Sequence, residues 1–157
     1  MSTPTEVTAL ARRWAVDLNM GTEEAPDWQR ILGITNVAPS AEPNIEDSSD
    51  YEGDGWMGNT KTAQAWELGL TLNRKINDTA KVYHPTHEAL RLAAYATGSA
   101  SYVHVRRYDR NGLPEAYEGR ALVTWAESGG EYTALDQVEV TLTGDGALEL
   151  IDNPLAP

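Results

Sequence analysis

The sequence predicts a mainly β protein, an antiparallel β-sandwich or barrel of about seven strands with one flanking α-helix. Two observations predict it. Apolar residues recur at every second position in several short segments, and the tight-turn pairs Asn111-Gly112, Gly129-Gly130 and Asp145-Gly146 separate the later ones. Only one segment is rich in helix formers. With 157 residues, we expect a single domain over residues 1–157 that ends in a short tail at residues 152–157.

The strands follow from the alternation of apolar residues. In residues 13–20, Trp14, Val16 and Leu18 alternate with smaller or polar residues, so we predict a half-buried strand. Residues 28–37 predict a second strand, broken or bulged at Gly33. The other predicted strands are residues 62–75, 101–109, 117–127, 136–143 and 147–151.

The helix is expected between Pro85, which suits the first turn, and Gly98, which suits the end. Residues 87–97 are mostly helix formers, and we expect His84 to start the helix. A narrow apolar stripe would pack on a sheet. It consists of Ala89, Leu90, Ala93 and Ala96.

Residues 38–63 carry the signals of irregular structure, namely two prolines and three spaced glycines. A connection of this length is usually functional or disordered. It is acidic, so its carboxylates and free backbone groups have to stay in water or find a partner. We therefore consider a solvated linker and an assembly loop. The candidate subunit-interface residues are Glu46, Asp47, Ser48, Asp50, Glu52, Asp54 and Trp56.

Charge and composition exclude several functions. The net charge is −12, and the tight basic groups are Arg12-Arg13, Arg74-Lys75 and Arg106-Arg107 with Arg110. A phosphate backbone normally binds larger basic clusters, so we expect no grip on nucleic acid. The absence of cysteine excludes disulfides and thiolate metal sites. No apolar run is long enough for a membrane span.

Metal and catalytic motifs are weak or missing. Read as a calcium loop, Asp50, Glu52 and Asp54 would be ligands, but the closing position is Lys61, which favours a solvated acidic loop. His84, His87 and His104 lack the further ligands of a zinc site. No nucleophile elbow or phosphate-binding glycine loop is present. We expect no cofactor and no enzyme.

The five tryptophans fall into two groups. Trp14, Trp66 and Trp125 lie on apolar faces of predicted strands and are expected in the core. Trp28 and Trp56 border the acidic segment and are candidates for contacts with a partner, because half-exposed tryptophans often anchor interfaces.

In this order of elements the chain resembles the major tail (tail tube) proteins of long-tailed, non-contractile bacteriophages. The resemblance rests on the strand at 13–20, on the motif W-x-x-I-x-G-I and on the strand AWELGLTLN at 65–73. It rests also on the acidic segment with Ser48-Ser49-Asp50 and Gly55-Trp56, the single helix and the closing hairpins. In the motif the matching residues are Trp28, Ile31, Gly33 and Ile34.

The resemblance implies that six copies join their sheets into a ring and that rings stack into a tube through which DNA passes without specific binding. It implies a virion tail protein made in the bacterial host cytoplasm, with tape-measure, tail-terminator and baseplate or distal tail proteins as partners. An acidic lumen would keep DNA from the wall. The lumen candidates are polar residues of alternating strands, for which an outer solvated face is the alternative: Asp17, Asn19, Glu67, Thr71, Glu139 and Thr141.

Three other functions stay open on the sequence. A carbohydrate- or calcium-binding β-sandwich module would use Trp28 and Trp56 as a platform for a sugar. A small hydrolase would need two carboxylates close across a cleft. The inner tube of a contractile injection device would have the same fold class as the tail tube.

Overall fold

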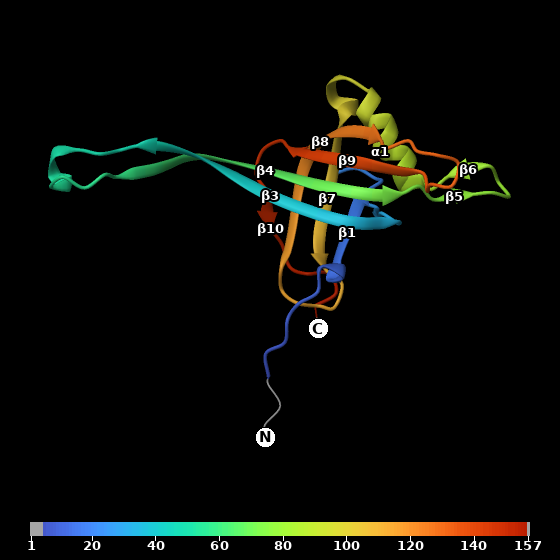
Figure 1. The fold of residues 1–157 in the computed structure, drawn as a ribbon, viewed down its shortest axis with the longest axis horizontal. Helices are drawn as coiled ribbons and strands as arrows, with labels where there is room; N and C mark the ends of the chain where they lie inside the picture. The colour runs from blue at the N-terminus through green and yellow to red at the C-terminus, as the bar shows by residue number, and fades with distance from the viewer. Residues whose placement is uncertain (1–4, 157) are drawn as a thin grey trace.

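The computed structural model describes residues 5–156, and within them it contains ten strands, one α-helix and three short 3-10 helices (Figure 1). The predicted mainly β class with one helix is confirmed. The strand count exceeds the prediction for two reasons. The predicted strand at 28–37 is divided at Gly33 into β2 and the start of β3, and β5 and β6 have only two residues each, which is too short for an alternating pattern. The strands are β1 (Trp14–Asn19), β2 (Trp28–Arg30), β3 (Ile34–Asp47), β4 (Asn59–Asn73), β5 (Ile76–Asn77), β6 (Val82–Tyr83), β7 (Tyr102–Asp109), β8 (Ala116–Glu127), β9 (Gln137–Gly144) and β10 (Glu149–Leu150).

Eight of the strands form one antiparallel sheet in the order β2-β1-β7-β8-β9-β4-β3, and β10 also pairs with β8. The sheet does not close, so β2 and β3 are its edges. The first part of β8 pairs with β7 and β10, and its last part pairs with β9. Figure 1 shows β1 and β7 running across the direction of β3, β4 and β9. The sheet therefore folds into two layers around one core.

The core is built from strands whose apolar side chains alternate along the chain. Leu68, Leu70 and Leu72 of β4 are buried, and each lies opposite a buried residue of β9. Val16 and Leu18 of β1 belong to the same cluster from the other layer. The period of two thus predicts which side of β4 and β9 is inward.

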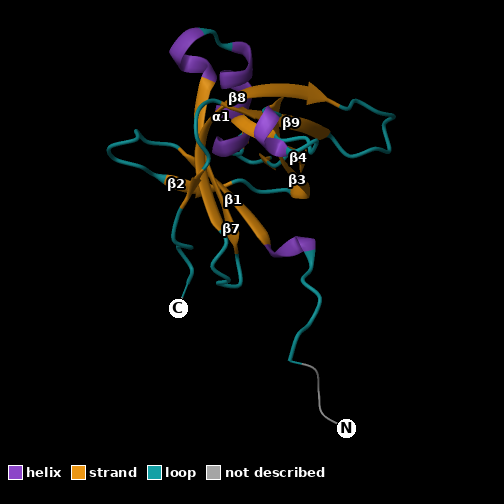
Figure 2. Cartoon of the chain, turned by 90° about the vertical axis from the view of Figure 1, so that its left-hand side faces the viewer, coloured by secondary structure: helices purple, strands orange, loops and turns teal. Residues whose placement is uncertain are grey.

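One helix, α1 (Pro85–Tyr95), contributes to this core through Leu90 and Ala93. It begins at the expected proline, and the ring of His84 accepts a hydrogen bond from the Thr86 backbone N–H, so His84 is the start residue. Figure 2 shows α1 at the end of the molecule opposite the N-terminal segment. The helix ends two residues before the predicted position, so Ala96 lies outside it.

His87 joins three parts of the chain beneath α1. Its side chain is completely buried. The Lys75 backbone N–H donates to Nδ1 at 3.2 Å, so Nε2 carries the proton and donates to the Leu32 carbonyl at 2.6 Å. Burial lowers the pKa of this imidazole, and the neutral ring satisfies both partners. His87 therefore ties the end of β4 and the chain before β3 to the helix.

Two expectations for the strands are wrong. Residues 38–63 were expected to be irregular, but residues 38–47 belong to β3 and residues 59–63 belong to β4, and the two strands pair from Ile34 opposite Leu72 to Asp47 opposite Asn59. Only the connection at 48–58 is irregular. Prolines 39 and 43 are tolerated because β3 is an edge strand. The strand β1 was expected to be half-buried, but Ala15 to Leu18 are all buried, because side chains cover its second face as well: Ala15 packs with Tyr108, and Arg106 and Tyr108 contact Asp17.

Trp66 is the first buried residue of β4 after the exposed stretch 59–65. Its indole lies on two glycines of the neighbouring strands. A Cβ atom on Gly144 would lie 2.3 Å from the indole, and one on Gly119 would lie 2.6 Å from it. The indole Nε1 donates to the Gly146 carbonyl at 3.1 Å, and this hydrogen bond also fixes the orientation of the ring. These contacts leave no room for a larger residue at either glycine.

We expect Gly144→Ala to destabilise the fold by about 1–3 kcal/mol, because the added methyl group overlaps a ring that cannot move aside. Gly69→Ala is the matched control, because a Cβ there would meet its nearest atom at an ordinary 3.5 Å. That change should leave the free energy of unfolding unchanged or raise it by up to about 1 kcal/mol. Urea unfolding followed by tryptophan fluorescence measures both. Equal stabilities of the two variants would contradict the packing argument.

Candidate assembly surfaces

The outer half of the β3–β4 hairpin projects from the body as an arm (residues 41–65), whose end (residues 46–57) we call the tip (Figure 1). Every residue of β3 from Ala38 to Asp47 is exposed, and so is β4 from Asn59 to Ala65. A strand pair exposed on both faces gains no burial of its own. The arm therefore packs on nothing else within residues 5–156.

The tip is held by its own hydrogen bonds. Asp50 caps the 3-10 helix η2 (Tyr51–Gly53) by accepting from the Gly53 backbone N–H. Asp47 accepts from the Ser49 backbone N–H, and hydrogen bonds from Ser49 lower the pKa of this carboxyl. Asp54 and Gly55 adopt positive φ angles of 54° and 85°. All seven predicted interface residues lie in this tip, and all are exposed: Glu46, Asp47, Ser48, Asp50, Glu52, Asp54 and Trp56.

The layer of β3, β4, β9 and the end of β8 presents a polar face away from the core. Because paired residues share a face, Thr71 lies beside Glu139, and Thr141 lies between Gly69 and Thr124. Glu67 lies beside Thr143 on the same face. Four of the six predicted lumen residues thus lie on one face, which we call the β4–β9 face.

The β4–β9 face bears carboxylates but no cation. Within the paired segments its charged side chains are Glu42, Glu67 and Glu139, and the others are small or uncharged. The arginine nearest in sequence, Arg74, is turned inward, with its guanidinium 4.1 Å from the Tyr83 ring and 5.1 Å from the Trp125 ring. Such a face repels phosphate and offers it no ion pair.

The two remaining lumen candidates lie on the other layer. Asp17 is 4% exposed and accepts two hydrogen bonds from the Arg106 guanidinium, at 2.9 and 3.0 Å. The Tyr108 hydroxyl donates to it as well, at 3.2 Å. Asn19 holds the 20–27 turn by accepting from the Gly21 and Asp27 backbone N–H groups. Both residues therefore have structural partners within the chain.

The tryptophans separate by environment. Trp66 is buried, and Trp125 packs on the core as expected. Trp14 is only partly buried, between the guanidinium groups of Arg13 and Arg107. Trp28 stacks on Arg106 and His104, whereas Trp56 is 83% exposed at the tip. Trp28 and Trp56 thus lie on different parts of the molecule and form no common platform.

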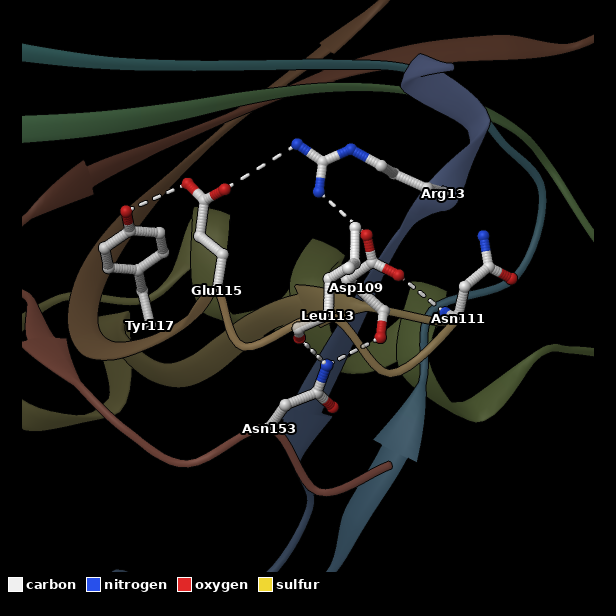
Figure 3. A network of polar contacts seen from close by, with 7 residues as sticks. All are labelled: Arg13, Asp109, Asn111, Leu113, Glu115, Tyr117 and Asn153. Carbon is white, nitrogen blue, oxygen red and sulfur yellow. Dashed lines mark hydrogen bonds and ion pairs between the residues drawn. The ribbon is translucent and has the colours of Figure 1, made fainter. Parts of the chain in front are cut away.

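A polar network fixes the end of the molecule where both termini lie (Figure 3). Asp109 is fully buried and pairs with Arg13 at 2.8 Å, and it also accepts from the Asn111 backbone N–H at 2.6 Å. The hydrogen bond from Arg13 is the main reason that the pKa of Asp109 lies below its usual range. Asn153 donates to the carbonyls of Asp109 and Leu113. The predicted tail at 152–157 is thus anchored at least through Asn153.

The same end carries arginines with no carboxylate partner. Arg13 is shared between Asp109 and Glu115, at 2.8 and 3.6 Å. Arg12 and Arg110 are exposed, and neither forms an ion pair with any residue from 5 to 156. The Arg110 guanidinium donates to the Trp14 carbonyl at 2.8 Å, which fixes its position.

The acidic and histidine side chains that the structure describes form no cluster of the size that a metal site needs. Over residues 5–156, no three His, Asp or Glu side chains are close enough to hold a metal ion. In the same range no helix is long and apolar enough to cross a membrane. His104 lies 2.7 Å from Glu118, and it is partly covered rather than open to solvent.

The sequence does not reveal the network around Asp109 or the proximity of Arg110 to Arg12. It shows the basic groups, but not the register that places Trp14 opposite Asp109. Arg110 follows Asp109 directly, so this register brings it beside the segment that contains Arg12.

No protein-family model matches the chain, and no curated protein matches it. Solved structures share its fold. A chain in the virion of a native gene transfer agent particle is 13% identical with a TM-score of 0.70, over 92% of this chain and 99% of that chain. A chain in the tail of an empty gene transfer agent particle, with C6 symmetry, is 12% identical with a TM-score of 0.68, over 92% of this chain and 99% of that chain. A chain in the sheath–tube complex of an extracellular contractile injection system is 13% identical with a TM-score of 0.63, over 96% of this chain and 100% of that chain.

We expect Asp109→Asn to lower stability at neutral pH and to have a smaller effect in acid. The pKa of Asp109 is lower in the folded chain, so its carboxylate contributes stability above the pKa of the unfolded state, about 3.9. This contribution is lost as the pH falls through the folded pKa. Urea unfolding at about pH 7 and about pH 3 measures the difference from the wild type. The exposed Asp152→Asn is the control, and a difference for Asp109→Asn that stays constant with pH would contradict the assignment.

Proposed function

We propose that this chain is a structural tube subunit, six copies of which form a ring through which DNA passes, and that the rings stack into a phage-like tail tube. The observation that carries the proposal is the β3–β4 hairpin. Its inner half presents a polar, acidic face without cations, and its outer half projects without packing on any other part of residues 5–156. A lumen wall and an inter-subunit arm need these two properties. The proposed role requires no catalysis.

The open sheet supports ring formation. An edge strand with free N–H and C=O groups pairs readily with another chain. Here the edges are β2 and β3, on opposite sides of the sheet. A head-to-tail contact between these two sides repeats around an axis and closes when the rotation fits. Closure around the β4–β9 face would place Glu67, Thr71, Glu139 and Thr141 on the lumen wall.

The shared fold supports the same role. The similar chains come from a C6-symmetric particle tail and from a sheath–tube complex. A non-contractile tail tube is our first choice because of the resemblance in sequence. The inner tube of a contractile injection system is the second, favoured by the likeness to the sheath–tube complex. A tape-measure protein, a terminator and a baseplate would be partners in a phage tail.

Concentrated purified protein should form rings or tubes of uniform width in negative-stain electron microscopy, and sedimentation should show assembly rising with concentration. Shortening the arm should prevent this while leaving the fold intact, because the arm contributes nothing to the core. Residues 45–62 are replaced by Asn-Gly, which makes a two-residue hairpin turn between the paired residues Asn44 and Ala63.

Circular dichroism and urea unfolding are the controls for folding of the shortened chain. A wild-type chain that stays monomeric at every concentration and salt, also with tail-initiating partners, would overturn the proposal. Tubes formed normally by the shortened chain would show that the arm is not the assembly element.

The lumen assignment is tested by labelling single cysteines, because the chain has none of its own. In assembled tubes we expect Thr141→Cys to react with a small maleimide but not with a maleimide joined to a large polymer, because only small molecules reach the lumen wall. Glu149→Cys, exposed on β10 in the other layer, is the control and should react with both. Reaction of Thr141→Cys with the large reagent would place this face outside the tube, and reaction with neither would place it in an interface.

A further inference from the structure

The end of the molecule that carries both termini has a cavity of about 730 Å³, which we call the N-terminal pocket. This volume lies in the range of about 300–1,000 Å³ that is typical of binding pockets. Its lining combines exposed apolar side chains with arginines from the 3-10 helix η1 (Ala11–Arg13) and from the turn after β7. The lining residues used below are Val7, Leu10, Arg12, Arg13, Arg110 and Leu113.

The N-terminal pocket is positively charged, and one of its walls is fixed by hydrogen bonds. Arg13 is neutralised by Asp109 and Glu115, so Arg12 and Arg110 supply the free charge. The apolar members Val7, Leu10 and Leu113 are each more than half exposed. The network around Asp109 holds the β7–β8 turn in place (Figure 3). Two free guanidinium groups beside exposed apolar side chains fit an occupant that is acidic and apolar together.

The tip of the arm has this combination. Its carboxylates Asp50, Glu52 and Asp54 are exposed, and no cation lies among residues 42–54. Beside them, Tyr51 and Trp56 expose nearly all of their rings. A large aromatic group surrounded by charges is a common anchor in protein interfaces. The arm extends away from the body and cannot reach the pocket of its own chain (Figure 1).

The other large cavity fits this occupant less well. It lies between α1 and the end of β1, with a volume of about 630 Å³. Its single arginine, Arg120, is held by Asp145, and Glu23 also lines it. A carboxylate entering there would meet a neutralised arginine and a like charge. Electrostatics therefore favour the N-terminal pocket for the acidic tip.

We propose that the tip of one copy docks into the N-terminal pocket of a second copy. The tip carboxylates face Arg12 and Arg110, and Trp56 packs on the apolar rim. This inference rests on the proposed function, and it adds the receptor surface for the arm. It also gives a reason for the two arginines, which form no ion pair with any acid among residues 5–156.

Charge exchange tests the docking. Arg12→Glu with Arg110→Glu should leave the monomer folded but abolish tubes, and Asp50→Lys with Glu52→Lys should do the same. The chain that carries all four changes should assemble again, because the charges are complementary once more. Tubes at the wild-type level in the Arg12/Arg110 variant, or no recovery with all four changes, would overturn the proposal.

Cysteine crosslinking locates the contact directly. Under an oxidant, a chain with Trp56→Cys and Leu10→Cys should give a ladder of disulfide-linked oligomers from assembled protein. The control pairs Trp56→Cys with Leu92→Cys, which lines the other cavity, and should give no ladder. A ladder from the control alone would refute the proposed site. The two proposals can be told apart. If only the docking site is wrong, the wild-type chain still forms tubes; if the wild-type chain forms no tubes, the proposed function is overturned.

Discussion

The position of Trp66 is the constraint on which the rest of the structure depends. It is the residue where β4 changes from exposed to buried, so the arm leaves the body at this point. Its ring is held between Gly119 and Gly144 and by a hydrogen bond to the Gly146 carbonyl. The direction of the arm therefore follows from the packing of one side chain on two strands. An arm without such an anchor would turn freely, and its contacts with another copy would lose their geometry.

The same hairpin serves two environments because strand residues alternate between faces. On β4, Leu68, Leu70 and Leu72 supply the core, while the residues between them supply the cation-free polar face. In the proposed tube, a positive charge on that face would attract DNA, and its threonine, glycine and glutamate residues carry none. Cations lie on other surfaces: Arg74 stacks on aromatic rings, and Arg106 pairs with Asp17.

The fold class, the helix and the inward residues of β4 and β9 could be predicted from the sequence. A strand that is buried on one face has an apolar residue at every second position, and this pattern is visible in the sequence. The arm could not be predicted, for the same reason. A hairpin exposed on both faces has no apolar alternation, and prolines on an edge strand look like those of a loop. Asp17 shows a second limit. Its alternation indicated an outward residue, and only the pairing with β7 reveals that Arg106 and Tyr108 cover it.

The paired arm also changes how assembly would proceed. A disordered loop loses about 1–2 kcal/mol of backbone entropy for each residue that it orders on binding. Here the ladder between β3 and β4 and the hydrogen bonds of Asp47, Asp50 and Ser49 already hold the tip in one conformation. Little of that cost would remain at the moment of docking. Recognition between two copies would then depend on their relative orientation and on long-range electrostatic attraction. Salt screens this attraction, so it would slow association while leaving the shape of both partners unchanged.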